Sequence, residues 1–68
     1  MRTGYRQYAI LTEDPAFKDF YEFIERYNLQ FEPHLNRTRA LIPTGKILTE
    51  FLLRFPSAIY VADYGSYS

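Results

Sequence analysis

The sequence predicts a compact α+β domain with the element order β-α-β-β-α-β. Residues 15–28 and 45–55 carry apolar side chains at three- and four-residue spacing, which is typical of helices with one buried face. Four shorter apolar stretches flank these helices and end at proline or turn residues, as strands do. With right-handed crossovers, this order most often forms a ferredoxin-like four-stranded antiparallel sheet with both helices on one face. A different strand order within the same class is the alternative.

The first part of the chain predicts a strand followed by a helix. Residues 6–12 form a short run of bulky residues typical of a strand. Asp14 and Pro15 mark a helix start, because an aspartate caps free amides and a proline fits the first turn. The helix is expected to end at Tyr27 or Asn28, and its apolar stripe consists of Phe17, Phe20, Tyr21, Ile24 and Tyr27. Phe23 lies beside this stripe, so it either widens the buried face or serves as an exposed contact.

The middle of the chain predicts a β-hairpin. Apolar and polar residues alternate over residues 29–35, which places Leu29, Phe31 and Leu35 on one side of a strand. Pro33 cannot donate to a strand ladder, so this strand belongs at a sheet edge or contains a bulge. A turn at Asn36 then leads into the partner strand, residues 37–42.

The last third predicts a second helix and a final strand. Thr44 is expected to cap a helix over residues 45–55. Pro56 ends this helix, because the residue before a proline is disfavoured in the helical conformation. The final strand spans residues 57–64, and residues 65–68 are expected to form a frayed tail.

Chain length and composition limit the class of protein. The 68 residues make a single domain, 1–68, and a hydrophobic content of 47% is too high for a disordered chain. Without cysteine the chain forms neither a disulfide nor a thiolate metal site. No apolar run approaches the ~20 residues that a membrane-spanning helix needs. We therefore expect a cytoplasmic domain that does not enter a membrane.

Charge is balanced over the whole chain but uneven along it. Eight basic residues match eight acidic ones, so neither a strongly basic nucleic-acid binder nor an acidic nucleic-acid mimic fits. Residues 13–32 contain six acids and two bases, whereas residues 33–54 contain four bases and one acid. The first helix therefore carries an acidic face, formed by Asp19, Glu22 and Glu25, which is either an ordinary solvated face or a second docking surface.

No residue pattern predicts catalysis. Gly45 and Lys46 lie at a predicted helix start, but the other residues of a phosphate-binding loop are missing. His34 is the only histidine and lies two residues from Glu32 on the polar side of a strand, a pattern typical of a surface histidine. We therefore expect no enzyme activity, no catalytic residue, no cofactor and no metal.

A sheet that is covered by helices on one face leaves its other face open to solvent. In the predicted hairpin this open face carries Gln30, Glu32, His34, Arg37, Arg39 and Leu41. In the last strand, Ile59 and Val61 are expected to point inward, which leaves Tyr60 outward. For the first strand, the pattern does not decide whether Tyr8 and Ile10 or the residues between them face the helices.

Tyrosine is unusually frequent in this chain. Seven tyrosines exceed what so small a core needs, although some can simply cover its rim. Tyrosine and arginine are enriched at protein-contact hot spots. Because the first and last strands are neighbours in the predicted fold, we expect a partner-binding surface formed by Tyr8, Arg37, Arg39, Tyr60 and Tyr64.

These observations predict a small non-catalytic interaction module that acts by protein–protein docking. Its size suits a regulator or inhibitor of a host protein, of the phage or mobile-element type, and exposed strands make a homodimer part of this hypothesis. The alternative is a single-stranded nucleic-acid-binding module that uses arginine and tyrosine on the open sheet face.

Overall fold

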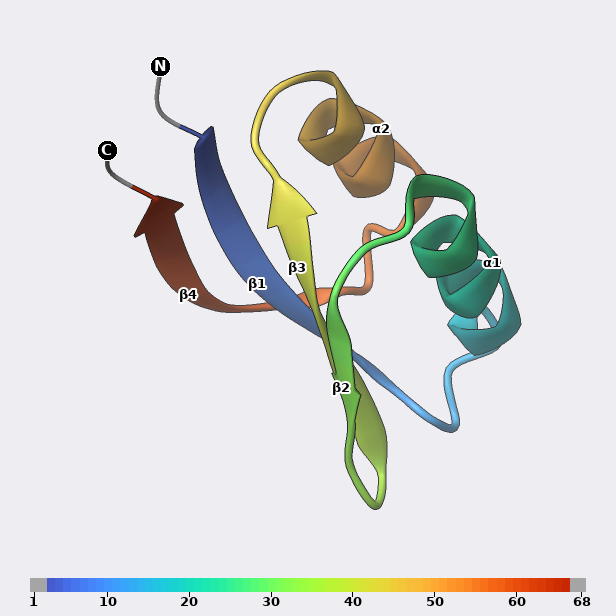
Figure 1. Cartoon of the computed structure of the whole chain (residues 1–68). Coiled ribbons are helices and arrows are strands. Elements are labelled where there is room, and N and C mark those ends of the chain that lie inside the picture. The colour runs from blue at the N-terminus through green and yellow to red at the C-terminus, as the bar shows by residue number, and fades with distance from the viewer. Residues whose placement is uncertain (1–2, 67–68) are drawn as a thin grey trace.

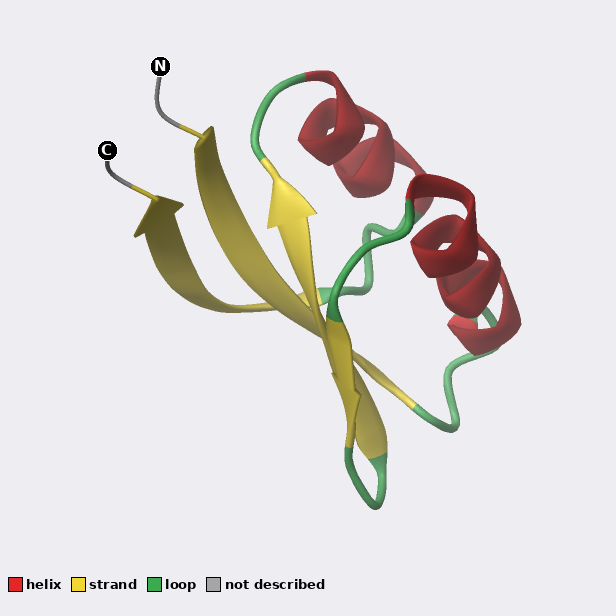
Figure 2. Cartoon of the chain, viewed as in Figure 1, coloured by secondary structure: helices red, strands yellow, loops and turns green. Residues whose placement is uncertain are grey.

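The computed structural model describes residues 3–66 and contains four strands and two helices (Figures 1 and 2). The elements follow the predicted order: β1 (Thr3–Leu11), α1 (Phe17–Tyr27), β2 (Phe31–Pro33), β3 (Arg37–Pro43), α2 (Lys46–Arg54) and β4 (Ile59–Ser66). The prediction of a small α+β domain with a four-stranded antiparallel sheet and two helices is confirmed.

The sheet has the strand order β2-β3-β1-β4, and each neighbouring pair is antiparallel. Both helices lie on one face of this sheet, as Figure 1 shows. No helix or loop of residues 3–66 crosses the other face (Figure 2). The two-layer arrangement therefore gives the domain one buried sheet face and one open sheet face.

The core fills the space between the helices and the two central strands. Tyr8 and Ile10 of β1 and Ala40 and Ile42 of β3 point toward the helices and are buried. The helices contribute Phe20, Phe23, Ile24, Leu48 and Phe51, and Phe55, directly after α2, completes the core. Phe23 thus widens the buried face of α1, and the question left open for the first strand is answered in favour of Tyr8 and Ile10.

Neither helix has the predicted residue at its N-cap position. Asp14 accepts a hydrogen bond from the Ala16 backbone N–H at 2.8 Å, but α1 begins only at Phe17, three residues after it. Thr44 does not cap α2, so that prediction is wrong; Gly45 occupies the N-cap position with no side-chain hydrogen bond. At the other end of α1, Asn28 adopts the left-handed conformation that commonly ends a helix.

The first hairpin strand is shorter than expected. β2 consists of three residues and ends at Pro33, so the alternation predicted up to Leu35 does not continue. Leu35 instead lies at the hairpin turn and is 99% exposed, and the backbone N–H of His34 donates to the Arg37 carbonyl across that turn at 2.7 Å. The proline removes a ladder donor and ends the strand before Leu35 can point inward.

The last strand begins and ends later than predicted. β4 continues through Gly65 and Ser66, whose backbones pair with Gly4 and Thr3. The first half of the predicted tail is therefore strand, and residues 67–68 lie outside the part of the chain that the structure describes.

A β-bulge reverses the expected facing of the start of β4. The β1–β4 register shifts between Gln7 and Tyr8, where one extra β4 residue, Val61, has no partner. Tyr60 pairs with Tyr8 and shares its helix side, whereas Ile59 pairs with Ala9 on the open side. The prediction that Tyr60 points to the open face and Ile59 to the core is wrong, because strict alternation cannot anticipate an inserted residue.

Candidate functional site

The sheet face opposite the helices, called the open face below, gathers side chains from all four strands. Directly paired residues of neighbouring strands point to the same side of a sheet, so the register assigns its members. They are Tyr5, Gln7, Ala9 and Leu11 of β1, Glu32 of β2, Arg37, Arg39, Leu41 and Pro43 of β3, and Ile59, Ala62 and Tyr64 of β4. The open face is thus mixed, with aromatic, aliphatic, amide and charged groups.

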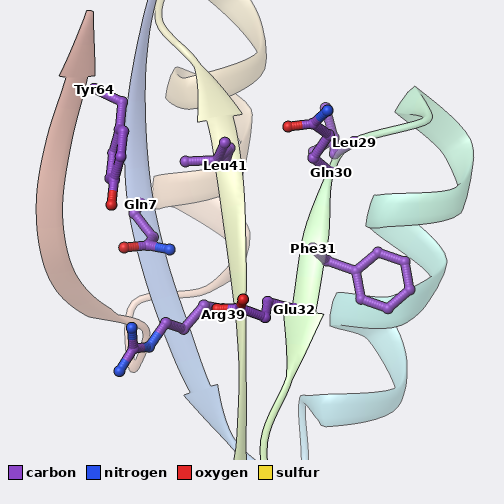
Figure 3. Close-up of a pocket in the computed structure, with 8 residues that line it drawn as sticks. All are labelled: Gln7, Leu29, Gln30, Phe31, Glu32, Arg39, Leu41 and Tyr64. Carbon is purple, nitrogen blue, oxygen red and sulfur yellow. The ribbon is translucent and has the colours of Figure 1, made fainter.

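The central part of the open face is hollowed, and we call this depression the central hollow. It has a volume of about 590 Å³ and is lined by Gln7, Leu29, Gln30, Phe31, Glu32, Arg39, Leu41 and Tyr64 (Figure 3). In Figure 3, Leu41 lies between Tyr64 and Gln7 on one side and Gln30 on the other. The ring of Phe31 turns away toward α1, where it meets Tyr21 at a centroid distance of 5.6 Å.

Two arginines on the open face keep their charge available. Neither Arg37 nor Arg39 forms an ion pair with another residue between 3 and 66. Glu32 is the ladder partner of Arg39, yet its carboxylate contacts His34 Nε2 at 3.1 Å. The guanidinium groups can therefore bind an outside acceptor without first breaking a salt bridge to another residue between 3 and 66.

Two tyrosines lie opposite each other at one end of the open face. Tyr64 of β4 pairs with Tyr5 of β1, which places both rings on the open side. Tyr64 is half exposed and also lines the central hollow, whereas Tyr5 is more covered. An aromatic ring at the rim of a depression offers apolar area and a hydroxyl group with little side-chain entropy to lose.

The other two tyrosines of the predicted surface lie on the helix side. Tyr8 is only 7% exposed, and its ring contacts Phe51 at a centroid distance of 5.2 Å, so it belongs to the core. Tyr60 packs edge-on against Tyr8 at 5.7 Å but remains 52% exposed, because it lies on the edge strand. The structure therefore divides the five predicted contact residues: Arg37, Arg39 and Tyr64 lie on the open face, and of these Arg39 and Tyr64 line the central hollow.

Tyr60 belongs to a small polar cluster with Asp63 and Arg6. Arg6 Nε lies 3.5 Å from the Asp63 carboxylate across the β1–β4 pair. Hydrogen bonding to the Asp63 carboxylate, with some desolvation, raises the pKa of Tyr60 above its usual value. A tyrosine of this kind stays protonated and acts as a hydrogen-bond donor rather than as a base.

The acidic residues of α1 lie in the other layer of the molecule. Asp19, Glu22 and Glu25 are exposed and occupy the helix that covers the opposite sheet face. The structure thus separates an acidic helix layer from the arginines of the open face. A partner on the open face has no contact with these acids unless it wraps around the domain.

A second polar cluster joins the two helices. The Tyr27 hydroxyl of α1 donates to the Glu50 carboxylate of α2 at 2.6 Å, and Arg54 donates to the same carboxylate at 3.2 Å. The hydrogen bond from Tyr27 is the main reason that the pKa of Glu50 is lowered, and the same bond raises the pKa of Tyr27. This cluster stabilises the helix pair and does not line the central hollow.

Within residues 3–66, no three side chains of the metal-ligating types come together. Neither helix in this range has the length and apolar composition to span a bilayer.

The sequence did not identify Gln7 of the central hollow, or Tyr5 beside it on the open face, as contact residues. Both faces of the first strand look apolar in the sequence, because Ala9 and Leu11 alternate with Tyr8 and Ile10. The one residue that could indicate the solvent-facing side of this strand was Gln7, because its polar side chain fits the open face better than the core. Without the strand register, that single residue could not assign the face.

Comparisons of the chain with protein-family models, with curated protein sequences and with solved structures gave no match.

Proposed function

We propose that this protein is a non-catalytic docking module that binds a protein partner through its open face. The observation that carries this proposal is the central hollow, which Tyr64, Leu41 and Arg39 line together and which no helix or loop of residues 3–66 covers. Binding hot spots typically combine an aromatic or arginine anchor with surrounding contacts that exclude water. The open face offers this combination on regular strands, which hold the side chains in place before the partner arrives.

The composition of the hollow indicates the chemistry of the partner. Arg39 of the hollow, and Arg37 farther along the same strand, would bind carboxylates, and Gln7 and Gln30 would exchange hydrogen bonds with peptide groups. Leu41 and Tyr64 would cover an apolar side chain. We therefore propose that the partner presents an acidic loop or extended segment with one apolar residue, and that the domain regulates or inhibits this protein by covering its surface.

The chemistry of the lining residues supports docking rather than catalysis. Amide, aromatic, aliphatic and guanidinium groups dominate the hollow, and its carboxylate, Glu32, already contacts His34. General acid–base or nucleophilic catalysis needs a base and a reacting group held at hydrogen-bond distance within a water-excluded site. The hollow is instead a shallow, open depression (Figure 3).

Single-stranded nucleic-acid binding is the second candidate, and one observation favours it. Tyr5 and Tyr64 lie opposite each other on the same face as Arg37 and Arg39, so stacking and phosphate contacts could be combined. Glu32 on that face opposes a phosphate backbone. We rank protein docking first because the central hollow contains one tyrosine, whereas base-stacking platforms use successive aromatic rings.

The experiment compares two double variants in an affinity capture from the lysate of the encoding organism. Arg39→Ala/Tyr64→Ala changes the open face, and Lys46→Ala/Leu53→Ala is the matched control on α2. The proposal expects a stoichiometric protein partner that survives nuclease, is lost at least about tenfold with the open-face variant and is kept by the control.

Oligonucleotide binding by fluorescence anisotropy separates the two candidates. Affinity for a single strand that falls steeply with salt and with Arg39→Ala/Tyr64→Ala would favour the nucleic-acid function. Equal partner capture by the open-face variant and the wild type, with both folded, contradicts the proposed surface.

The arrangement of the strands supports a finer assignment of the fold. The order β2-β3-β1-β4, antiparallel throughout, with both helices on one face, agrees with a ferredoxin-like arrangement. We propose this assignment with the function, although a fold of this type does not imply any particular activity.

A further inference from the structure

β4 is the least covered element of the domain. It lies at one end of the strand order, so its outer edge has no neighbouring strand within residues 3–66. Its side chains Ile59, Tyr60, Val61 and Tyr64 are between 39% and 52% exposed. The strand is therefore open at its edge and poorly covered on both faces, and Figure 1 shows it away from both helices.

The two edges of the sheet are protected very differently. β2 is only three residues long and ends at Pro33, and both features discourage pairing with another strand. β4 has eight residues and contains no proline, lysine or arginine. Its one charged residue, Asp63, is already held by Arg6 of the same chain at 3.5 Å.

We propose that β4 pairs antiparallel with β4 of a second copy, so that the two sheets form one continuous sheet. An unpaired edge offers a row of N–H and C=O groups that another strand can bind in place of water, and an edge strand can pair antiparallel with a second copy of itself around a twofold axis. The regular segment beyond the bulge, Ala62–Ser66, supplies the backbone groups for this pairing.

A second copy fits this edge better than a strand of another protein. The chain has no net charge, so two copies approach without overall repulsion. The protected β2 edge stops the assembly at two copies, whereas two open edges would lead to filaments. The twofold axis is perpendicular to the sheet, so the open faces of both copies lie on the same side of the dimer.

The dimer is expected to be weak. An aromatic side chain carries about 150–250 Å², so the exposed halves of Tyr60 and Tyr64 together amount to roughly 200 Å² per copy. Stable interfaces bury about 800 Å² per partner. We therefore expect weak association, with dimer and monomer both populated only toward high protein concentration.

The test is sedimentation equilibrium of the purified chain from about 5 to about 500 µM, a range that spans weak association. Wild type should pass from monomer to dimer and no further. Antiparallel self-pairing of Ala62–Ser66 puts the twofold axis at Tyr64, so Tyr64→Lys places like charges opposite each other across it and should raise the dissociation constant at least about tenfold. Leu53→Lys, at an exposed site on α2, is the matched control and should leave the dissociation constant unchanged.

Amide hydrogen exchange locates the interface independently of the variants. Outer-edge amides of β4 should become more protected as concentration rises, while the amides of β2 should not. Circular dichroism shows whether each variant is folded. A wild-type chain that stays monomeric at the highest concentration contradicts the proposal, and so does a dimer that leaves β4 amides unchanged or that only Leu53→Lys disrupts.

Discussion

Tyr27 and Glu50 illustrate how single residues hold the helix layer together. The Tyr27 hydroxyl donates to the Glu50 carboxylate at 2.6 Å, and both side chains lie at the surface between α1 and α2. Each residue changes the pKa of the other, because the hydrogen bond needs a protonated tyrosine and an ionised glutamate. Because of this contact, the free energy of unfolding depends on pH in two separate ranges, an acidic one through Glu50 and an alkaline one through Tyr27.

Tyr27→Phe should reduce the pH dependence of stability at both ends. The pKa of Glu50 is lowered from 4.5, so its contribution is present above that pH and is lost as the pH falls through the folded pKa. The pKa of Tyr27 is raised from 10.0, so its contribution is present below that pH and is lost as the pH rises through the folded pKa. Urea unfolding across both pH ranges measures the effect.

The matched control for this prediction is Tyr21→Phe. Tyr21 also lies on α1 and packs against Phe17, but its hydroxyl forms no hydrogen bond with another residue between 3 and 66. It should keep the wild-type dependence on pH. Equal pH profiles for Tyr27→Phe and wild type would show that the helix-to-helix hydrogen bond does not form in solution.

Phe51 is the residue on which the core depends most. It is fully buried and its ring contacts those of Tyr8, Phe20, Phe23 and Phe55. Phe51→Ala should cost about 3–5 kcal/mol, close to the total of roughly 3–10 kcal/mol expected for 68 residues. Circular dichroism should show a largely unfolded chain, while Leu52→Ala, at a partly exposed neighbour, should stay folded. A cooperatively folded Phe51→Ala chain contradicts this packing.

At the scale of elements, the turn into α2 depends on glycine. Gly45 has φ of 106°, and a Cβ built there meets no atom within 4 Å, so the constraint comes from the backbone alone. Gly45→Ala should therefore destabilise the domain by about 1–3 kcal/mol, measured by urea or thermal unfolding. Gly4→Ala is the control, because its Cβ would meet Thr44 at an ordinary 3.6 Å. Equal stabilities of the two variants would contradict the strained turn.

The elements were predictable from the sequence to the extent that their periodicity is regular. The stripe from Phe17 to Tyr27 has helical spacing throughout, and the expected end of α1 agrees with the structure. β3 alternates without interruption, so Ala40 and Ile42 could be assigned to the core and Arg37 and Arg39 to the open face. Where apolar and polar residues recur at a regular spacing, the side of the helix or strand on which each residue lies can be predicted from its neighbours.

The remaining errors come from features that periodicity does not encode. The bulge at Val61 changes the facing of Tyr60 and Ile59, and it depends on the pairing of β4 with β1 rather than on the local sequence. β1 is apolar on both faces, so only its partners show that Tyr8 is buried and Tyr5 is not. Of the predicted contact residues, those on regular strand segments reach the open face, and those near the bulge or the core do not.

At the scale of the whole molecule, the domain has two sides with different character. Helices, with acidic residues on α1, form one layer, and the open face with its arginines and central hollow forms the other. If β4 pairs with a second copy, the two open faces lie on the same side, which would let a dimer engage a repetitive or dimeric partner with increased avidity. The proposed function therefore depends most on the claim that the open face is the binding surface.

Site-specific photo-crosslinking tests that claim most directly. A photoreactive amino acid replaces Gln7 in the central hollow in one sample and Lys18 on the exposed side of α1 in the other. Both proteins are irradiated in the lysate of the encoding organism, with and without nuclease. If the open face binds a protein partner, the Gln7 position gives a discrete, nuclease-resistant protein adduct and the Lys18 position gives none. The same adduct from the Lys18 position alone, or Gln7 adducts that consist only of nucleic acid, would contradict the claim.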